Sequence, residues 1–175
     1  MATATTTELP TGTWNLDPVH SHVEFAVPYL IGTFRGSFSP VSATLVDGVL
    51  RGSASVAGIK VQDEDLEAHL RSPEFFDAER TPEITFTASG ATVAGDKVVV
   101  DGELTLKGIT KPVELTGTVT EPIEDAFGQT RIGLTLETTV DRTDFDLNWN
   151  VPLPSGEPAL KNEVTLTADL YLVKA

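Results

Sequence analysis

Cysteine is absent from the 175-residue chain. Its absence excludes disulfides, thiolate nucleophiles, Cys-based zinc sites and iron–sulfur clusters. It leaves the cellular compartment open, because secreted proteins also do without cysteine. Long apolar runs are missing as well, since no segment approaches the roughly 18 to 20 residues that a membrane-spanning helix requires. We therefore expect no stable membrane insertion.

Basic residues are scarce: 12 Lys and Arg stand against 26 Asp and Glu, which gives a formal net charge of −14. A surface this acidic repels phosphate backbones and anionic lipid headgroups, so we expect no nucleic acid partner. The charge mainly serves solubility in this interpretation. Hydrophobic residues make up 40% of the chain and charged residues 22%, as in ordinary globular proteins. The length suits one domain with a good core.

The N-terminal residues 1–8 contain no basic residue and no apolar stretch, so they do not form a secretory signal. We predict a flexible leader over residues 1–10, a single domain over residues 11–175, and a cytoplasmic location. An exported protein from which a signal had been removed would show the same N-terminus.

The rest of the chain alternates apolar and polar residues with the period of two that is typical of β-strands. The clearest example is residues 97–107, and similar stripes cover residues 113–119, 132–140 and 164–172. Shorter stripes occupy the N-terminal half. Residues 108–112 contain Gly and Pro and predict a hairpin connection, whereas Gly58 interrupts a stripe and predicts a bulge. These patterns indicate an all-β protein with many antiparallel strands.

One segment departs from the alternation. Residues 63–70 begin with acids and place Leu66 and Leu70 four residues apart, which predicts a short helix with a favourable N-terminal charge. Ser72 and Pro73 could cap and open a second turn. We therefore expect a short helical insertion around residues 63–77.

The apolar stripes contain small residues that leave space beside larger ones. These are Gly36, Gly52, Ala54, Ala88, Gly102, Gly117 and Ala168. Two packed sheets would normally fill such space, because protein interiors reach crystal-like density. A barrel of about eight strands could instead keep a lumen for a slender ligand. The alternative, which the sequence leaves equally open, is that the glycines mark bulges and bends.

Six ordered blocks of the sequence resemble the YceI-like family. The first reads Trp-Asn-Leu-Asp-Pro-Val-His-Ser-His-Val-Glu-Phe and matches the family's opening strand; the blocks are residues 14–25, 32–38, 69–78, 82–86, 102–113 and 141–145. Departures occur at residues 27–30, where family members commonly carry a histidine, and at residues 58–63, which replace a Ser-x-x-Thr-Gly stretch. Both would lie near a ligand headgroup.

The resemblance implies an extended, lipocalin-like antiparallel β-barrel of eight strands with a short helical insertion near one mouth. It also implies that a polyisoprenoid, a quinone tail or another long-chain fatty lipid binds inside the barrel. Many members of the family form dimers, so a homodimer is one expected assembly.

Two polar motifs invite a catalytic or metal-binding interpretation. His20 and His22 would share one strand face and could reach one metal ion, although a third ligand is needed. We favour a structural role in which His20 and Ser21 bind backbone groups at a turn.

In residues 141–144 we expect Arg142 to bridge two carboxylates at a barrel end. Phosphate-binding and HExxH motifs are absent, so we predict no catalytic residue, no metal and no cofactor.

Apolar side chains are the better candidates for ligand contact. The predicted ligand-binding residues are Phe25, Phe34, Phe38, Leu70, Phe75, Phe76, Phe86, Leu104, Leu136 and Trp149. The helical segment is expected to cover one opening, and Trp149 to shield it. As plain core residues the phenylalanines would have the same pattern.

The sequence thus predicts a protein that binds, carries or sequesters a long-chain lipid without transforming it. One alternative is an enzyme that acts on a hydrophobic substrate in the same pocket, which would require an ionisable group on the interior face. Another is a filled structural barrel that acts through its acidic surface.

Overall fold

A computed structural model describes residues 8–175 of the chain. The helices are α1 (Glu64–Arg71) and the 3₁₀-helix η1 (Arg142–Phe145). The strands are β1 (Thr13–Leu16), β2 (His22–Tyr29), β3 (Gly32–Phe38), β4 (Val41–Val46), β5 (Val49–Ser55), β6 (Glu83–Ala94), β7 (Lys97–Leu106), β8 (Ile109–Val119), β9 (Ile123–Glu124), β10 (Thr130–Asp141) and β11 (Glu163–Lys174).

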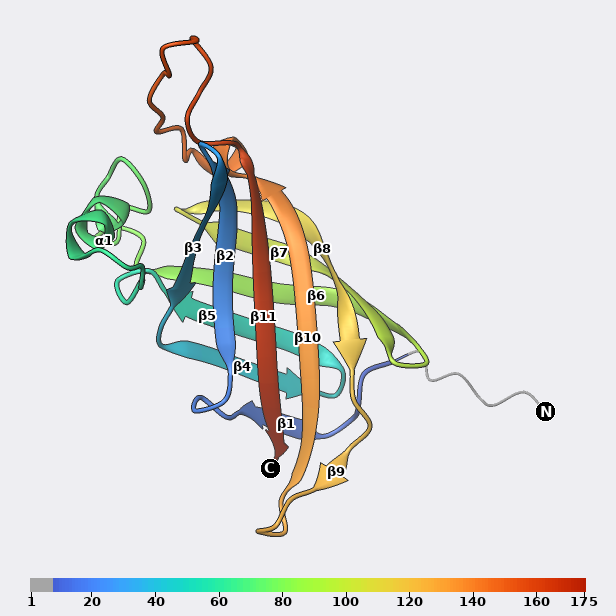
Figure 1. Ribbon diagram of the computed structural model, residues 1–175. Helices are drawn as coiled ribbons and strands as arrows, with labels where there is room; N and C mark the ends of the chain where they lie inside the picture. The colour runs from blue at the N-terminus through green and yellow to red at the C-terminus, as the bar shows by residue number, and fades with distance from the viewer. Residues whose placement is uncertain (1–7) are drawn as a thin grey trace.

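The strands form a closed antiparallel barrel (Figure 1). Strand β11 pairs with β10 on one side and with both β1 and β2 on the other, so β1 and β2 occupy successive stretches of one position. Strands β3 and β4 likewise occupy successive stretches of the next position, because β4 pairs with β1 and β3 pairs with β2. The short β9 only extends the edge of β10. The predicted barrel of eight strand positions is therefore confirmed.

The alternation in β7 corresponds to its two faces. Val98, Val100, Leu104 and Leu106 are buried, whereas the intervening acids are exposed. The turn into β8 is tighter than expected: Leu106 pairs directly with Ile109 across a two-residue turn in which both residues have positive φ. Such turns match the twist of the strands that they join.

The predicted bulge lies elsewhere. The strand register shifts between Ala88 and Gly90, in β6. Gly58 instead lies in a turn after β5, where a Cβ would come within 1.6 Å of the Ser39 carbonyl oxygen. Close backbone approach, and not a bulge, explains this glycine.

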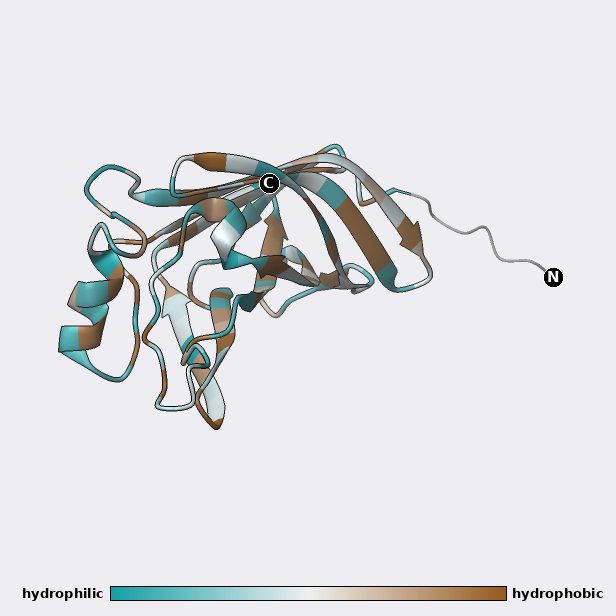
Figure 2. Ribbon diagram, turned by 90° about the horizontal axis from the view of Figure 1, so that it is seen from above, coloured by the Kyte–Doolittle hydropathy of each residue, from teal (hydrophilic) through white to brown (hydrophobic). Residues whose placement is uncertain are grey.

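The helical insertion is confirmed as the helix α1 followed by turns. Asp63 caps the helix by accepting hydrogen bonds from the backbone N–H groups of Asp65 (2.8 Å) and Leu66 (3.4 Å). Ser72 ends the helix, and residues 73–76 form turns without a second helix. Seen from above, α1 lies at one side of the barrel and carries both hydrophilic and hydrophobic residues (Figure 2).

The apolar residues form two buried clusters, one beneath α1 and one toward the opposite end of the barrel. Leu9 belongs to the second cluster and is only 2% exposed, so the packed structure begins before the predicted domain boundary at residue 11. Residues 1–7 of the predicted leader lie outside the described residues. No helix in residues 8–175 has the length and apolar character needed to cross a bilayer.

Candidate ligand-binding site

Two apolar cavities lie inside the barrel. The upper cavity, next to α1 and η1, has a volume of about 170 Å³, and the lower cavity has about 110 Å³. Val164 and Leu166 of β11 line the upper cavity, and Leu166, Ala168 and Leu170 line the lower one. Because strands rise about 3.3 Å per residue, these alternate residues follow a path of about 20 Å. The cavities therefore lie end to end along β11.

All ten predicted ligand-binding residues lie in the cavity walls. Those in the upper cavity are Phe25, Phe34, Phe38, Leu70, Phe75, Phe76 and Trp149. Those in the lower cavity are Phe38, Phe86, Leu104 and Leu136. Phe38 belongs to both walls, as do Ile84 and Leu166. The structure thus brings these side chains together, and their contact with a ligand stays a prediction.

Phenylalanine rings pack against one another where the cavities meet. The Phe38 ring lies 5.4 Å from that of Phe25 and 5.6 Å from that of Phe76, measured between centroids. An apolar cavity of about 150 Å³ holds one benzene, or about 25 Å³ for each carbon. The upper cavity therefore holds about seven carbons and the lower cavity about four.

The small residues of the apolar stripes have two different roles. Gly52, Ala54 and Ala168 line the lower cavity, as the hollow-barrel interpretation requires. Gly36 instead makes room for a phenylalanine ring, because an added Cβ would lie 2.5 Å from the Phe25 ring. At Gly102 an added Cβ would lie 2.4 Å from the Thr87 carbonyl oxygen and 2.5 Å from the Phe86 ring. The space beside these two glycines is therefore occupied by protein atoms and does not belong to an empty lumen.

Gly117 has a third explanation. A Cβ at this position would lie 1.7 Å from the carbonyl oxygen of Thr135 on the paired strand β10. The glycine therefore permits close contact between β8 and β10.

Three polar side chains that the sequence analysis did not select also line the upper cavity: Tyr29, His69 and Arg142. Tyr29 is 39% exposed, and His69 and Trp149 are partly exposed, so this cavity lies just beneath the surface. The His69 ring contacts Trp149 edge-on at a centroid distance of 5.2 Å, and its Nε2 lies 2.7 Å from Glu74 Oε2. Tyr29 continues the alternate stripe begun by Phe25, which is a signal that sequence reasoning could have used.

Arg142 does not bridge two carboxylates as predicted. Its Nε donates to the carbonyl oxygen of Lys161 (2.9 Å) and its Nη1 to that of Leu147 (2.6 Å). The neighbouring Asp141 carboxylate accepts from the backbone N–H and the hydroxyl of Thr143 instead, and these hydrogen bonds lower the pKa of Asp141. Burial lowers the pKa of Arg142, which still stays protonated at neutral pH.

The His20-Ser21-His22 motif is mainly structural. Ser21 Oγ accepts a hydrogen bond from the Tyr171 backbone N–H (2.9 Å), as predicted for a turn residue. The predicted backbone contact of His20 is wrong, because its Nδ1 lies 2.8 Å from the Asp17 carboxylate. His20 precedes β2, in which His22 is the first residue. No cluster of three metal-ligating side chains occurs within residues 8–175.

Asp17 also joins an ion cluster at the other end of the barrel. Arg131 donates to Asp17 (2.8 Å) and to Asp125 (2.6 Å). Hydrogen bonds from His20 and Arg131 hold the pKa of Asp17 well below its usual value. This cluster is far along β10 from Arg142, so it does not belong to the cavities.

A closed antiparallel barrel with an apolar interior defines the class of lipocalin-like barrels. The family model described as the YceI-like domain matches residues 14–172. The chain belongs to the YceI-like family.

Relatives and solved structures agree with this assignment. A UPF0312 protein of Photorhabdus laumondii is 29% identical over 149 residues, which cover 81% of this chain and 78% of that protein. Protein YceI of Salmonella arizonae is 28% identical with the same coverage. The fold is similar to that of BcnA from Burkholderia cenocepacia, with a TM-score of 0.76, 22% identity, and coverage of 91% of this chain and 99% of that one.

A second solved structure is described as a polyisoprenoid binding domain from Saccharophagus degradans. It has a TM-score of 0.69 and 14% identity, and the match covers 93% of this chain and 98% of that one. At these identities the likeness establishes the fold.

Proposed function

We propose that this protein binds a lipid with an apolar chain, such as an isoprenoid, a quinone tail or a fatty chain, and carries or sequesters it without chemical change. The observation that carries the proposal is the pair of apolar cavities that lie end to end along β11. The polyisoprenoid binding domain with the same fold supports an isoprenoid as one candidate ligand.

Burial of the chain supplies the affinity. Each buried CH₂ contributes about 0.8 kcal/mol, so ten carbons contribute about 8 kcal/mol before the cost of association. Since the two cavities together hold about eleven carbons, a ten-carbon prenol such as geraniol fits this conformation. A longer chain would exceed the combined volume of the two cavities.

Two alternatives receive less support. A filled structural barrel would leave no space for the two cavities. An enzyme requires reactive groups inside the barrel, and the ionisable side chains of the cavity walls are Tyr29, His69 and Arg142, all at the upper cavity. Their arrangement offers no nucleophile that is hydrogen-bonded to a base.

Identification of the native ligand tests the proposal. Protein purified from its own host is weighed by native mass spectrometry, and the bound molecule is then extracted and identified. We expect an extra mass that corresponds to a lipid, and a rise in melting temperature of the lipid-free protein with geraniol or decanol. A lipid-free mass together with no stabilisation by either alcohol would refute the proposal.

The cytoplasmic location and the homodimer expected from the sequence belong to the same proposal. Cell fractionation tests the first, and light scattering of the purified protein tests the second.

A further inference from the structure

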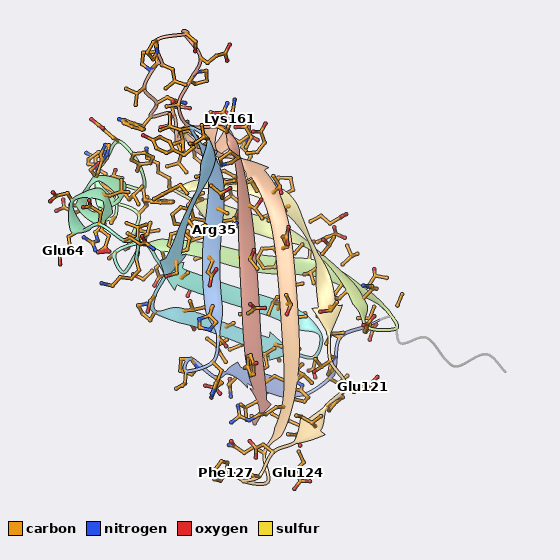
Figure 3. The ribbon with its side chains drawn as sticks, in the orientation of Figure 1. Arg35, Glu64, Glu121, Glu124, Phe127 and Lys161 are labelled. Carbon is orange, nitrogen blue, oxygen red and sulfur yellow. The ribbon has the colours of Figure 1, made fainter. Side chains whose placement is uncertain are left out.

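Arg142 is a buried charge in the wall of an apolar cavity. It is the first residue of η1, directly after β10, and its side chain is only 4% exposed. Hydrogen bonds to the carbonyl oxygens of Lys161 and Leu147 fix the guanidinium at the upper rim of the barrel, where Lys161 precedes β11 (Figure 3). The side chain is therefore held in one position beside the upper cavity.

No carboxylate lies within 4 Å of this cation among residues 8–175, and the neighbouring Asp141 attracts it only from a longer distance. None of the ion pairs in this part of the chain includes Arg142. The buried carboxylate of Glu67, by contrast, lies 3.5 Å from Arg71 and 3.9 Å from Lys60. Buried charges in proteins are normally paired, because removal of an ion from water is costly.

One guanidinium nitrogen of Arg142 is available to a ligand. Nε and Nη1 each donate to a carbonyl oxygen, whereas Nη2 has no hydrogen-bond partner among residues 8–175. Carbonyl oxygens satisfy hydrogen bonds but leave the positive charge in place. The upper cavity thus has apolar walls and one cation with a free donor.

We propose that the ligand carries a carboxylate that pairs with Arg142 while its chain fills the two cavities. This inference rests on the proposed function, since it requires a chain in the barrel. A carboxylate carries one charge and matches a single guanidinium that no carboxylate of residues 8–175 contacts directly. A phosphate carries nearly two charges at neutral pH and would leave one unbalanced beside apolar walls. The ligand is therefore a fatty acid or a prenoic acid.

The test compares three ten-carbon ligands, decanoate, decanol and decyl phosphate, by calorimetric titration of the full chain. A charge-assisted hydrogen bond predicts that decanoate binds roughly 10- to 100-fold more tightly than decanol. Arg142→Met is expected to abolish this ratio. The matched control is Arg35→Met, because Arg35 is exposed on β3 and absent from both cavity walls (Figure 3). The control should keep the ratio.

A second measurement needs no variant. A carboxyl NMR titration of ¹³C-labelled decanoic acid reports its pKa when bound to the wild-type protein. Pairing with Arg142 should lower this pKa below that of the free acid, whereas an apolar site without a cation would raise it. Separate titrations with His69→Phe and Tyr29→Phe show whether the other titratable groups in the cavity wall contribute to this shift.

The outcomes separate the two proposals. Equal affinity for decanoate and decanol, with a raised pKa of the bound acid, would overturn the carboxylate inference and leave the lipid-binding function intact. Tighter binding of decyl phosphate than of decanoate would overturn the choice of headgroup. If none of the three ligands binds, the proposed function fails.

Discussion

Filling the lower cavity should shorten the chain that the barrel accepts. Ala168 lines this cavity and pairs with Leu136 on one side and Val23 on the other. The substitution Ala168→Leu adds three carbons to a cavity that holds about four. The terminal part of an eleven-carbon chain would then have no room.

The expected loss of affinity for an eleven-carbon chain follows from the number of CH₂ groups that are no longer buried. About three CH₂ groups that stay in water, at about 0.8 kcal/mol each, cost about 2.4 kcal/mol of binding free energy, which corresponds to roughly 60-fold in Kd. A seven-carbon chain fits the upper cavity alone and should bind with unchanged affinity. The measurement is a calorimetric titration with alkyl alcohols of six to twelve carbons, which should show the affinity of the variant levelling off at about eight carbons.

Thr165→Leu provides the matched control. Thr165 lies on the same strand, alternates with the cavity-lining Val164 and Leu166, and faces outward toward Thr139. This variant should keep the chain-length dependence of the wild type. If Ala168→Leu weakened six-carbon and eleven-carbon alcohols equally, or neither of them, the two cavities would not act as one continuous binding site.

Four further substitutions test the barrel itself. Gly117→Ala places a Cβ 1.7 Å from a β10 carbonyl oxygen and should prevent cooperative folding, whereas Gly90→Ala, with nothing within 4 Å, should leave the melting temperature almost unchanged. Phe38→Ala should widen the lumen where the two cavities meet, lower the unfolding free energy in urea by about 3–5 kcal/mol, and extend the longest bound alcohol. Because hydrogen bonds from His20 and Arg131 lower the pKa of Asp17, its stabilising effect is present above about pH 4 and lost at lower pH. The difference in unfolding free energy between wild type and Asp17→Asn should therefore shrink below about pH 4.

The sequence predicted the strands well because each apolar stripe has one buried face. In β7 the alternation alone identified the inward residues, since a shift by one residue would turn them all outward. Turn geometry was harder to predict. Residues 107 and 108 make a two-residue turn with positive φ at a lysine, which residue type alone does not indicate. The bulge in β6 depends on pairing with β7, and no local pattern marks it.

The apolar part of the site was predictable for the same reason, because a residue on the inner face of a barrel lines the lumen. The size of the lumen could not be predicted from the sequence. Gly36 and Gly102 have the same residue type as Gly52, yet the first two contact phenylalanine rings and the third lines a cavity. Arg142 was misinterpreted because its acidic neighbour Asp141 accepts hydrogen bonds from Thr143 once the chain folds. Charge pairing in three dimensions does not follow from proximity along the chain.

Chain length should also determine whether residues 64–77 stay packed on the barrel. Phe75 and Phe76 are 7% and 8% exposed, and both line the upper cavity. Moving both rings into water costs about 3–6 kcal/mol, which four to eight additional buried CH₂ groups would offset at about 0.8 kcal/mol each. A chain of about twenty carbons therefore exceeds the capacity of about eleven by enough to displace this segment.

Hydrogen exchange measured by mass spectrometry tests this coupling. Geraniol, with ten carbons, should leave the exchange of residues 64–77 unchanged or slower, because it fits the existing cavities. Geranylgeraniol, with twenty carbons, should accelerate exchange in α1 while β7 stays protected as an internal reference. If geranylgeraniol binds tightly and α1 exchanges as slowly as in the free protein, the additional carbons must lie outside the barrel, and chain length does not determine whether residues 64–77 stay packed.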